Sequence, residues 1–298
     1  MIPLTDENPV RRRPLVTFGI LAACLAIYFL WQPSFGGSDV IEVDTPAGTV
    51  QMGELIAFNL ERAAIPCEVV QGEPLTLDEA AATYGRSGGD GEDCGAGSRS
   101  SPELFPHKSV WLSLVTSMFL HGGLLHLGGN LLFLWVFGNN VEDHLGHVGF
   151  ALFYVLGGLA AAAVHIALNP DSTIPVVGAS GAIAAVMGAY LVWFPRARVR
   201  TLIFLGFFIT VIAVPAAVLL GLWFLMQFFT DPNSGVAWAA HVGGFVFGVV
   251  VGLLVRGSGR LRRAAWTDDH RPGPGWSGER RSSGRFGASS HRARRGRW

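Results

Sequence analysis

The chain has 298 residues, of which 50% are hydrophobic and only 15% are charged, and its mean hydropathy is +0.39. Soluble domains usually carry about 25% charged residues, so this composition excludes an ordinary soluble globular protein. Long uncharged runs alternate with short polar segments, which is typical of a protein that crosses a membrane several times. The formal net charge of zero says little, because basic and acidic residues gather in different parts of the chain.

Six apolar runs are candidate membrane-spanning helices, since about 20 apolar residues are needed to cross about 30 Å of hydrocarbon. They are Leu15–Trp31, Leu125–Asn139, Val148–Leu168, Val176–Phe194, Ile212–Thr230 and Val236–Val255. The uncharged stretch Thr201–Phe229 is too long for one span, and we interpret its first part as interfacial or as a helix extension, with Pro215 near the junction. No small-residue cleavage site follows Trp31, so we prefer an uncleaved first span to a signal peptide. The sequence thus predicts an all-α polytopic membrane protein.

The arginines predict the orientation. They stand before the first span, between the fourth and fifth, and after the sixth: Arg11, Arg12, Arg13, Arg196, Arg198, Arg200, Arg256, Arg260, Arg262 and Arg263. In a six-span chain these positions share one side, which the positive-inside rule makes cytoplasmic. Both termini, including segment 1–14, are then cytoplasmic, and the acidic segment 32–108 lies outside the cytoplasm. The abundance of Gly, Ala and Arg favours a bacterial plasma membrane.

The segment 32–108 is too long to be a plain connection. Glu54–Ala64 has helical spacing, and Leu75–Tyr84 could form a second short helix with Thr76 as its cap and Glu79 three residues later. Residues 85–102 are rich in Gly and Ser and are interpreted as flexible. The Arg-rich tail 256–298 favours a disordered segment near an anionic inner leaflet over specific nucleic-acid binding.

The three cysteines fall in two environments. Cys24 lies in the first span and is expected to behave as a small hydrophobe. Cys67 and Cys94 both lie in the segment placed outside the cytoplasm, where disulfides are permitted. We expect a bond between them rather than two free thiols, because it would stabilise a segment with few large apolar residues.

Four polar side chains stand out in the spans: His126, Asn130, Ser180 and His241. The spans hold almost no acidic or basic residues and show no inverted repeat, so a channel or ion-coupled transporter is disfavoured. Each polar group costs free energy in hydrocarbon unless it has a partner. All four lie near the outer ends of the second, fourth and sixth spans, with His165 apart near the outer end of the third, so we expect them to face one another or a water-filled cavity.

Small residues predict that the fourth and sixth spans pack closely. Two series repeat at helical spacing: Ser180, Ala184 and Gly188, and His241, Gly244, Gly248 and Gly252. Such seams let membrane helices approach. If the two seams meet, Ser180 and His241 lie side by side, and the histidine can accept the serine proton. A lone membrane serine is more often structural, so this interpretation depends on the joint pattern.

Three motifs resemble those of the rhomboid intramembrane serine proteases. HGGLLHLGGN (121–130) matches their HxxxxHxxxN motif, GASG (178–181) their GxSG nucleophile motif, and AHVGGFVFG (240–248) their AHxxGxxxG motif. The motifs occur in the family's order, within roughly residues 107–255. The resemblance implies a six-transmembrane-helix rhomboid bundle over residues 15–255, with a long extracytoplasmic first loop, that acts as an intramembrane serine endopeptidase without metal or cofactor.

The resemblance also implies roles for individual residues. Ser180 is the expected nucleophile and His241 the general base and then acid, with no carboxylate to orient it. Asn130, His126 and the backbone N–H of Ser180 are the expected oxyanion hole. His121 is expected to be structural or water-holding rather than catalytic. The motif glycines are expected to support the site: Gly178, Gly181, Gly244 and Gly248.

Two departures from the family pattern remove no reacting group. The family's first loop often carries a Trp-Arg pair, whereas here Trp111 is followed by Leu112 and Ser113. Some members have an aromatic residue four positions after the serine that stacks on the histidine. Here that position is Ala184, so His241 must be oriented by other packing, or less firmly.

The fifth span supplies a candidate gate for a substrate that enters from the lipid. Trp223, Phe224 and Phe228 are the gate candidates, with residues 230–235 above as a lid; the alternative is that these aromatic side chains only face lipid. The implied substrates are single-span membrane proteins with helix-weakening residues near the outer surface. The competing function is an inactive rhomboid-like protein that binds transmembrane helices without cleaving them.

Overall fold

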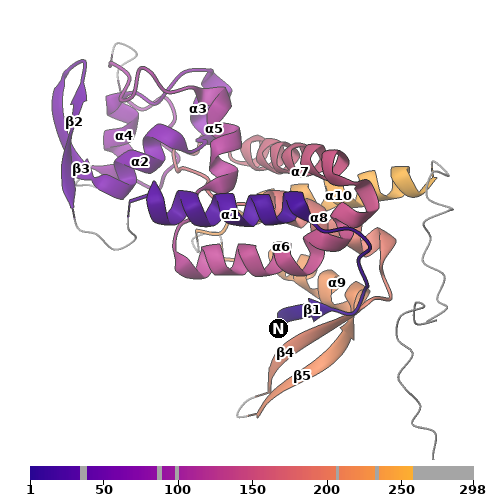
Figure 1. Ribbon diagram of the computed structural model, residues 1–298. Helices are drawn as coiled ribbons and strands as arrows, with labels where there is room; N and C mark the ends of the chain where they lie inside the picture. Colours follow the sequence, from indigo (N-terminus) through magenta and orange to yellow (C-terminus); the bar gives the residue numbers. More distant parts are fainter. Residues whose placement is uncertain (34–38, 86–88, 98–100, 206–207, 232–234, 258–298) are drawn as a thin grey trace, which may run out of the picture. The chain divides into compact units, whose positions relative to one another are not determined.

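The computed structural model describes residues 1–257 with gaps at 34–38, 86–88, 98–100, 206–207 and 232–234 (Figure 1). The chain divides into two units, Met1–Leu261 and Arg262–Trp298, and the second unit lies outside the described residues together with nearly all of the predicted tail. The elements are, in chain order, β1 (Ile2–Asp6), α1 (Leu15–Leu30), β2 (Val40–Thr45), β3 (Gly48–Gly53), α2 (Glu54–Arg62), α3 (Pro66–Gln71), α4 (Leu77–Tyr84), α5 (Val110–Thr116), η1 (Ser117–Phe119), α6 (Leu124–Leu145), α7 (His147–Leu168), α8 (Ser180–Trp193), β4 (Arg198–Leu205), β5 (Phe208–Pro215), α9 (Ala216–Gln227) and α10 (Trp238–Gly257).

In the described part of the chain, two helices are long and apolar enough to cross a membrane on their own, α7 and α10. A third crossing results if the pair Val110–Phe119 and Leu124–Leu145, bent by 80°, counts as one span. The remaining apolar helices, α1, α8 and α9, are shorter, at 10–17 residues. Every predicted apolar run therefore contains a helix, whereas length and composition alone support two or three spans, so the six-span arrangement stays a prediction.

The helices of the fourth and fifth predicted spans begin later in the chain than the sequence predicts. Helix α8 starts at Ser180 rather than Val176, because Gly178 has a φ of +128°, outside the helical region. Helix α9 starts at Ala216, after Pro215, instead of Ile212. Ser180 consequently stands at the very start of its helix, where backbone N–H groups have no intrahelical acceptor.

The prediction of an all-α chain is wrong at two places, where the structure has sheets. Residues interpreted as a possible helix extension form the β4–β5 hairpin, whose register pairs Arg198 with Pro215 and Leu205 with Phe208. Strand β1 adds to β4, so the sheet order is β1-β4-β5, and the hairpin projects away from the helices (Figure 1). Val, Ile, Thr and Phe dominate β4 and β5, and these residue types favour strands. The second sheet is the β2–β3 hairpin.

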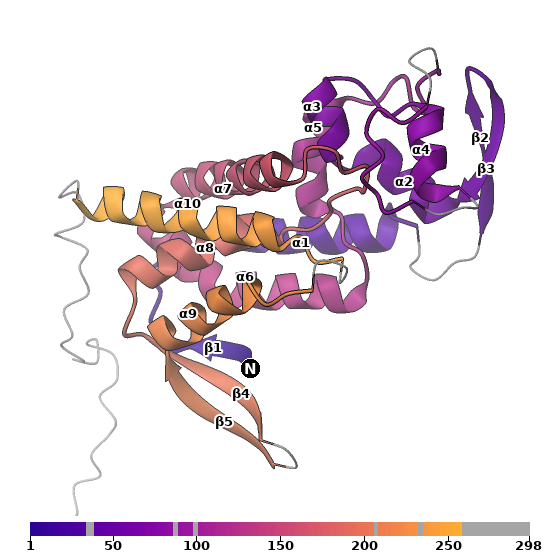
Figure 2. The same ribbon diagram turned by 180° about the vertical axis from the view of Figure 1, so that it is seen from behind.

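Helix α8 forms the centre of the helical core, in contact with α6, α7 and α10 (Figure 2). Its residues from Gly181 to Tyr190 are all buried. The seam with α10 is close: a Cβ on Gly244 would meet the carbonyl of Gly181, and one on Gly248 the carbonyl of Ala185. The predicted glycines on α10 are thus confirmed as contact residues. On α8 the predicted Gly188 is confirmed as a contact residue, since a Cβ there would meet the carbonyl of Phe245, and Gly181 and Ala185 are further contacts that the spacing did not predict.

Helices α1 and α6 are joined at one end by a carboxylate. Glu142, at the end of α6, accepts the backbone N–H groups of Val16 and Thr17 at 2.9 and 2.7 Å and the Thr17 hydroxyl at 2.7 Å. The N-terminus of a helix has unpaired N–H groups and a positive partial charge, both of which favour a carboxylate there. This contact explains an acidic residue at a side of the bundle otherwise marked by arginines.

The segment between α1 and α5 folds around a small core of its own. Helices α2 and α4 confirm the two predicted helices, and Thr76 and Glu79 form the predicted capping box. Buried residues share one cluster: Leu60, Ile65, Cys67, Leu75, Ala80 and Leu104. Cys67 and Cys94 are joined by a disulfide bond, as predicted.

The same segment is bonded to the loop that leads into α8. The backbone N–H of Cys67 donates to Ser172 O at 3.0 Å, that of Cys94 to Asp171 O at 3.3 Å, and that of Thr173 to Gly91 O at 2.9 Å. Within residues 85–102, Gly91 and Cys94 are therefore both hydrogen-bonded to the loop before α8. This corrects the interpretation of the segment as simply flexible.

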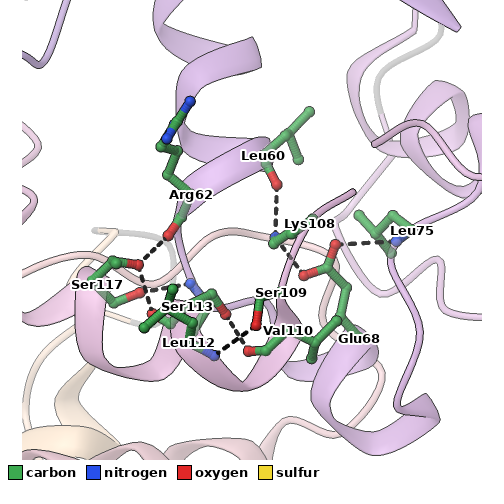
Figure 3. Close-up of polar contacts among 12 residues, drawn as sticks. Leu60, Arg62, Glu68, Leu75, Lys108, Ser109, Val110, Leu112, Ser113 and Ser117 are labelled. Atoms are coloured by element: carbon green, nitrogen blue, oxygen red, sulfur yellow. Dashed lines mark hydrogen bonds and ion pairs between the residues drawn. The ribbon is translucent and has the colours of Figure 1, made fainter. Parts of the chain in front are cut away.

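A buried ion pair fixes this segment to the start of α5 (Figure 3). Lys108 Nζ lies 2.5 Å from Glu68 Oε2 and donates to Leu60 O at 2.6 Å, with both charged side chains at most 2% exposed. Glu68 also accepts the N–H of Leu75 at 3.0 Å. Burial raises the pKa of Glu68 and lowers the pKa of Lys108, and their mutual attraction opposes both shifts. Each charge is thus tolerated only because the other is present.

We expect Lys108→Met to destabilise this segment by about 3–5 kcal/mol near neutral pH, because it leaves the Glu68 carboxylate buried without a partner. The loss should shrink as the pH falls, since protonation removes the charge from Glu68. Native-state hydrogen exchange of the α3 amides measures it. Glu61→Gln is the control: it removes an exposed ion pair with Arg62 and should cost under about 1 kcal/mol. Equal effects of the two variants would contradict the importance of the buried pair.

We expect the disulfide to form in the mature protein and to be structural. Alkylation without reduction should modify Cys24 alone, after unfolding, and mass spectrometry should find Cys67 and Cys94 in one cross-linked peptide. The double variant Cys67→Ser/Cys94→Ser should lose about 3–4 kcal/mol of local stability on the chain-entropy estimate, seen as faster hydrogen exchange in residues 171–173. Alkylated Cys67 and Cys94 in unreduced protein would rule the bond out.

Candidate active site

Ser180 and His241 meet across the α8–α10 seam. His241 Nε2 lies 2.8 Å from Ser180 Oγ, although 61 residues separate the two in sequence. Ser180 is the first residue of α8 and His241 lies in the first turn of α10. A serine hydroxyl that donates to an imidazole nitrogen is the arrangement in which a histidine can remove the proton of an attacking serine.

The second ring nitrogen of His241 is bonded to a residue that the sequence analysis missed. Nδ1 of His241 lies 2.8 Å from Oε1 of Gln227, the last residue of α9. Gln227 is buried, and its amide nitrogen donates to the backbone carbonyl of Trp223 at 2.9 Å. One signal could have revealed it: Gln227 is the single amide or charged side chain in an otherwise apolar helix. A buried amide requires partners.

His126 points one ring nitrogen toward the nucleophile motif. The backbone N–H of Gly122 donates to its Nδ1 at 3.3 Å, so the neutral ring carries its proton on Nε2. A Cβ on Gly178 would lie 2.7 Å from that Nε2 and 3.5 Å from Ser180 Oγ. Gly178 is thus required twice, by its positive φ and by the space that His126 occupies. The proton on Nε2 faces the region beside Ser180.

Asn130 follows His126 by one turn of α6 and is 7% exposed. Its Nδ2 is buried without a hydrogen-bond partner among the described residues. An unpaired buried donor costs free energy, and functional sites are where such groups persist. The Asn130 amide is therefore available to an incoming acceptor.

His121 is held by the structure around it. Its backbone N–H donates to Gln32 Oε1 at 3.1 Å, its carbonyl accepts from Gln32 Nε2 at 2.6 Å, and its Nδ1 lies 3.1 Å from Phe119 O. The ring is fully buried and lies edge-on to His126, with centroids 5.3 Å apart. These contacts suit the predicted structural role.

The gate candidates do not share one environment. The rings of Trp223 and Phe224 pack on Phe245 of α10, with centroids 6.0 and 4.6 Å apart, whereas Phe228 is 55% exposed. Trp223 also lies 5.7 Å from the His241 ring. Trp223 and Phe224 thus have partners on α10 while remaining partly exposed, and their role as a gate stays a prediction. Residues 232–234 of the predicted lid lie outside the described residues.

A cavity opens beside Ser180, lined by residues of α7, α8 and α10 and also of α5, η1 and the loop before α8. Small side chains such as Ala161, Ala182 and Ala240 line most of it, and His165 lines one part. The cavity can accept a small group next to the serine oxygen. Among the described residues, Cys67, Glu79 and Cys94 lie within reach of one ion, but this group fits a metal poorly because the two cysteine sulfurs are bonded to each other.

Comparisons with known proteins agree with the motifs. The family model of the rhomboid domain matches residues 108–258, just over half of the chain. The chain is 34% identical over 138 residues to "Rhomboid protease GluP" of Bacillus subtilis, covering 46% of this chain and 25% of that protein. It is 29% identical over 156 residues to "Rhomboid protein 1, mitochondrial" of Saccharomyces cerevisiae, covering 48% and 42%.

A third relative, "Rhomboid-like protein 11, chloroplastic" of Arabidopsis thaliana, is 38% identical over 80 residues, covering 27% of this chain and 28% of that protein. The chain thus spans less than half of the length of these relatives. Because the rhomboid domain model covers the helices that carry Ser180, His241, His126 and Asn130, the chain is a membrane protein that belongs to the rhomboid family.

Proposed function

We propose that the protein is an intramembrane serine endopeptidase in which Ser180 and His241 form the catalytic dyad. The observation that carries this proposal is the 2.8 Å contact between Ser180 Oγ and His241 Nε2 at the meeting point of α8 and α10. Family membership supports the same class of reaction, since one relative is named a rhomboid protease. The competing function, an inactive rhomboid-like binder of transmembrane helices, needs no such contact.

In the first half of the proposed reaction, Ser180 Oγ attacks the carbonyl carbon of the scissile peptide bond. The hydroxyl proton moves to Nε2 of His241, which becomes an imidazolium. The carbonyl oxygen becomes an oxyanion in the tetrahedral intermediate. His241 then gives the proton to the leaving nitrogen, the C–N bond breaks, and the new amine departs.

In the second half, water attacks the ester that joins Ser180 to the substrate. His241 Nε2 takes a proton from that water and returns it to Ser180 Oγ as the ester bond breaks, releasing a carboxylic acid. Hydrocarbon excludes water, so both halves need a polar site open to one side of the membrane. Ser180 and His241 lie at the N-terminal ends of α8 and α10, and we propose that this end of the two helices opens to water.

The proposed oxyanion hole consists of Asn130 Nδ2, His126 Nε2 and the backbone N–H of Ser180. Asn130 Nδ2 is buried without a partner among the described residues, and the proton on His126 Nε2 faces the serine. The start of α8 adds N–H groups and a favourable dipole. In the proposed reaction these donors would bind the negative charge that develops on the carbonyl oxygen.

The substrates that fit this proposal are single-span membrane proteins whose helix unwinds near the outer surface. Such a chain would enter from lipid past α9 and place a small side chain in the cavity beside Ser180. We further propose that both termini and the Arg-rich tail are cytoplasmic, with segment 32–108 on the opposite side, in a bacterial plasma membrane. No nucleic acid, metal or cofactor is part of this proposal.

We expect purified protein in liposomes to cleave a generic single-span substrate, and Ser180→Ala and His241→Ala each to abolish cleavage. His121→Ala is the control variant and should keep substantial activity, because its contacts are structural. Product bands on a gel, with the cut site read by mass spectrometry, measure the outcome. Cleavage at the wild-type rate by Ser180→Ala would refute the proposed chemistry, and an inactive wild type that still binds the substrate would favour the helix-binding alternative.

We expect Asn130→Ala to lower kcat by about 10²–10³ with a much smaller change in KM, because an oxyanion donor acts mainly in the transition state. Initial rates over a range of substrate densities in the bilayer separate the two constants. An effect confined to KM would argue against Asn130 as an oxyanion donor.

A further inference from the structure

The only amide side chain on α9 ends beside the histidine of the dyad. Helix α9, Ala216–Gln227, is apolar apart from Gln227. In a membrane helix an amide costs free energy unless both its oxygen and its nitrogen are paired. Gln227 is 7% exposed and pairs both: its oxygen lies 2.8 Å from His241 Nδ1, and its nitrogen donates to Trp223 O at 2.9 Å.

These two contacts determine which way the amide faces. The carbonyl of Trp223 can only accept, so the NH₂ group of Gln227 must face it. The amide oxygen then faces His241, and because that oxygen can only accept, Nδ1 of His241 carries the proton. The neutral ring is left with a bare Nε2, which is the atom that lies against Ser180 Oγ. Gln227 thus selects the tautomer in which His241 can act as a base.

The ring is also supported on one face from the same helix. Trp223 lies one turn before Gln227, and its ring centroid is 5.7 Å from that of His241, with an interplanar angle of 39°. The position four residues after Ser180 holds Ala184, which is fully buried and too small to stack on the ring. Orientation of His241 therefore comes from α9.

We propose that Gln227 is the positioning residue of His241: it fixes the tautomer and the angle of the ring through Nδ1. This inference rests on the proposed protease function. As Nε2 takes the serine proton, the ring becomes an imidazolium, and its N–H bond to the Gln227 oxygen strengthens. The contact therefore stabilises the transition state more than the ground state, which raises kcat.

The test compares three variants in liposomes. Gln227→Met keeps the length of the side chain and removes the acceptor, Gln227→Glu keeps an oxygen acceptor in place, and Met226→Leu is the control on the neighbouring residue, whose side chain is 60% exposed. Two rates are measured for each: cleavage of a single-span substrate, and labelling of Ser180 by a small fluorophosphonate, which needs the nucleophile but not a bound helix.

We expect Gln227→Met to lower kcat by about ten- to a hundredfold, with KM within about twofold of wild type, because a hydrogen bond to a charged group is lost in the transition state. Labelling should fall by a similar factor. Gln227→Glu should recover most of both rates, and Met226→Leu should match wild type. Labelling of Gln227→Met at the wild-type rate, a change in KM alone, or equal losses in the Met and Glu variants would overturn the proposal.

A readout without turnover separates this inference from the protease proposal. Nitrogen NMR of protein labelled at histidine, with His241→Ala to assign the signal, should show the His241 proton on Nδ1 in wild type and a different or mixed tautomer in Gln227→Met. A wild type that neither cleaves nor labels would end the protease proposal, while this spectrum would still decide the role of Gln227. The proton on Nε2 in wild type would overturn that role.

Discussion

The contact between Ser180 and His241 depends on how closely α8 and α10 can approach. Gly244 lies so near the carbonyl of Gly181, and Gly248 so near that of Ala185, that a Cβ at either glycine would strike backbone. Backbone cannot move aside as a flexible side chain can, so a larger residue would separate the helices. A proton passes only between atoms at hydrogen-bond distance, which makes the glycine seam a requirement of the dyad as much as of the packing.

The loop that leads into Ser180 is fixed by hydrogen bonds to residues outside the long helices. The backbone N–H of Gly178 donates to Ser117 O at 2.9 Å, and that of Val176 to Ala64 O at 2.8 Å. Ala64 in turn donates to the Ser117 hydroxyl at 2.6 Å. The turn before Ser180 is thereby tied both to η1 and to the segment that contains the disulfide. Since Gly178 also leaves space for His126, these bonds set the geometry of the nucleophile and of the expected oxyanion donors together.

The features that the sequence predicts well are those carried by local pattern or by spacing on one helix. The capping box of Thr76 and Glu79 lies within four residues, and the small residues of α10 repeat on one face of a single helix, so both could be read directly. Contacts that depend on how two helices are rotated against each other are harder to predict from sequence. The seam on α8 includes Gly181 and Ala185 in addition to the predicted Ser180 and Gly188, because spacing fixes a face only to within about one residue.

The β4–β5 hairpin was missed for a different reason. After Thr201 the residues of both strands are apolar except Thr210, so the period of two that marks a half-buried strand is absent over most of the hairpin. The β-branched residues were the remaining signal, and pairing with β1, almost 200 residues earlier in the chain, is not visible in any local window.

Helix α9 carries both the proposed gate residues and Gln227, the proposed positioning residue of His241. The family pattern directs attention to residues on α6, α8 and α10, yet the partner of His241 Nδ1 comes from α9, the helix past which a substrate is proposed to enter. Trp223 and Gln227 both contact His241 from that helix. A displacement of the end of α9 large enough to separate it from α10 would remove both the bond to Nδ1 and the contact with the Trp223 ring. If a substrate enters past α9, as proposed, its entry and the orientation of the proposed base would both depend on how α9 packs against α10.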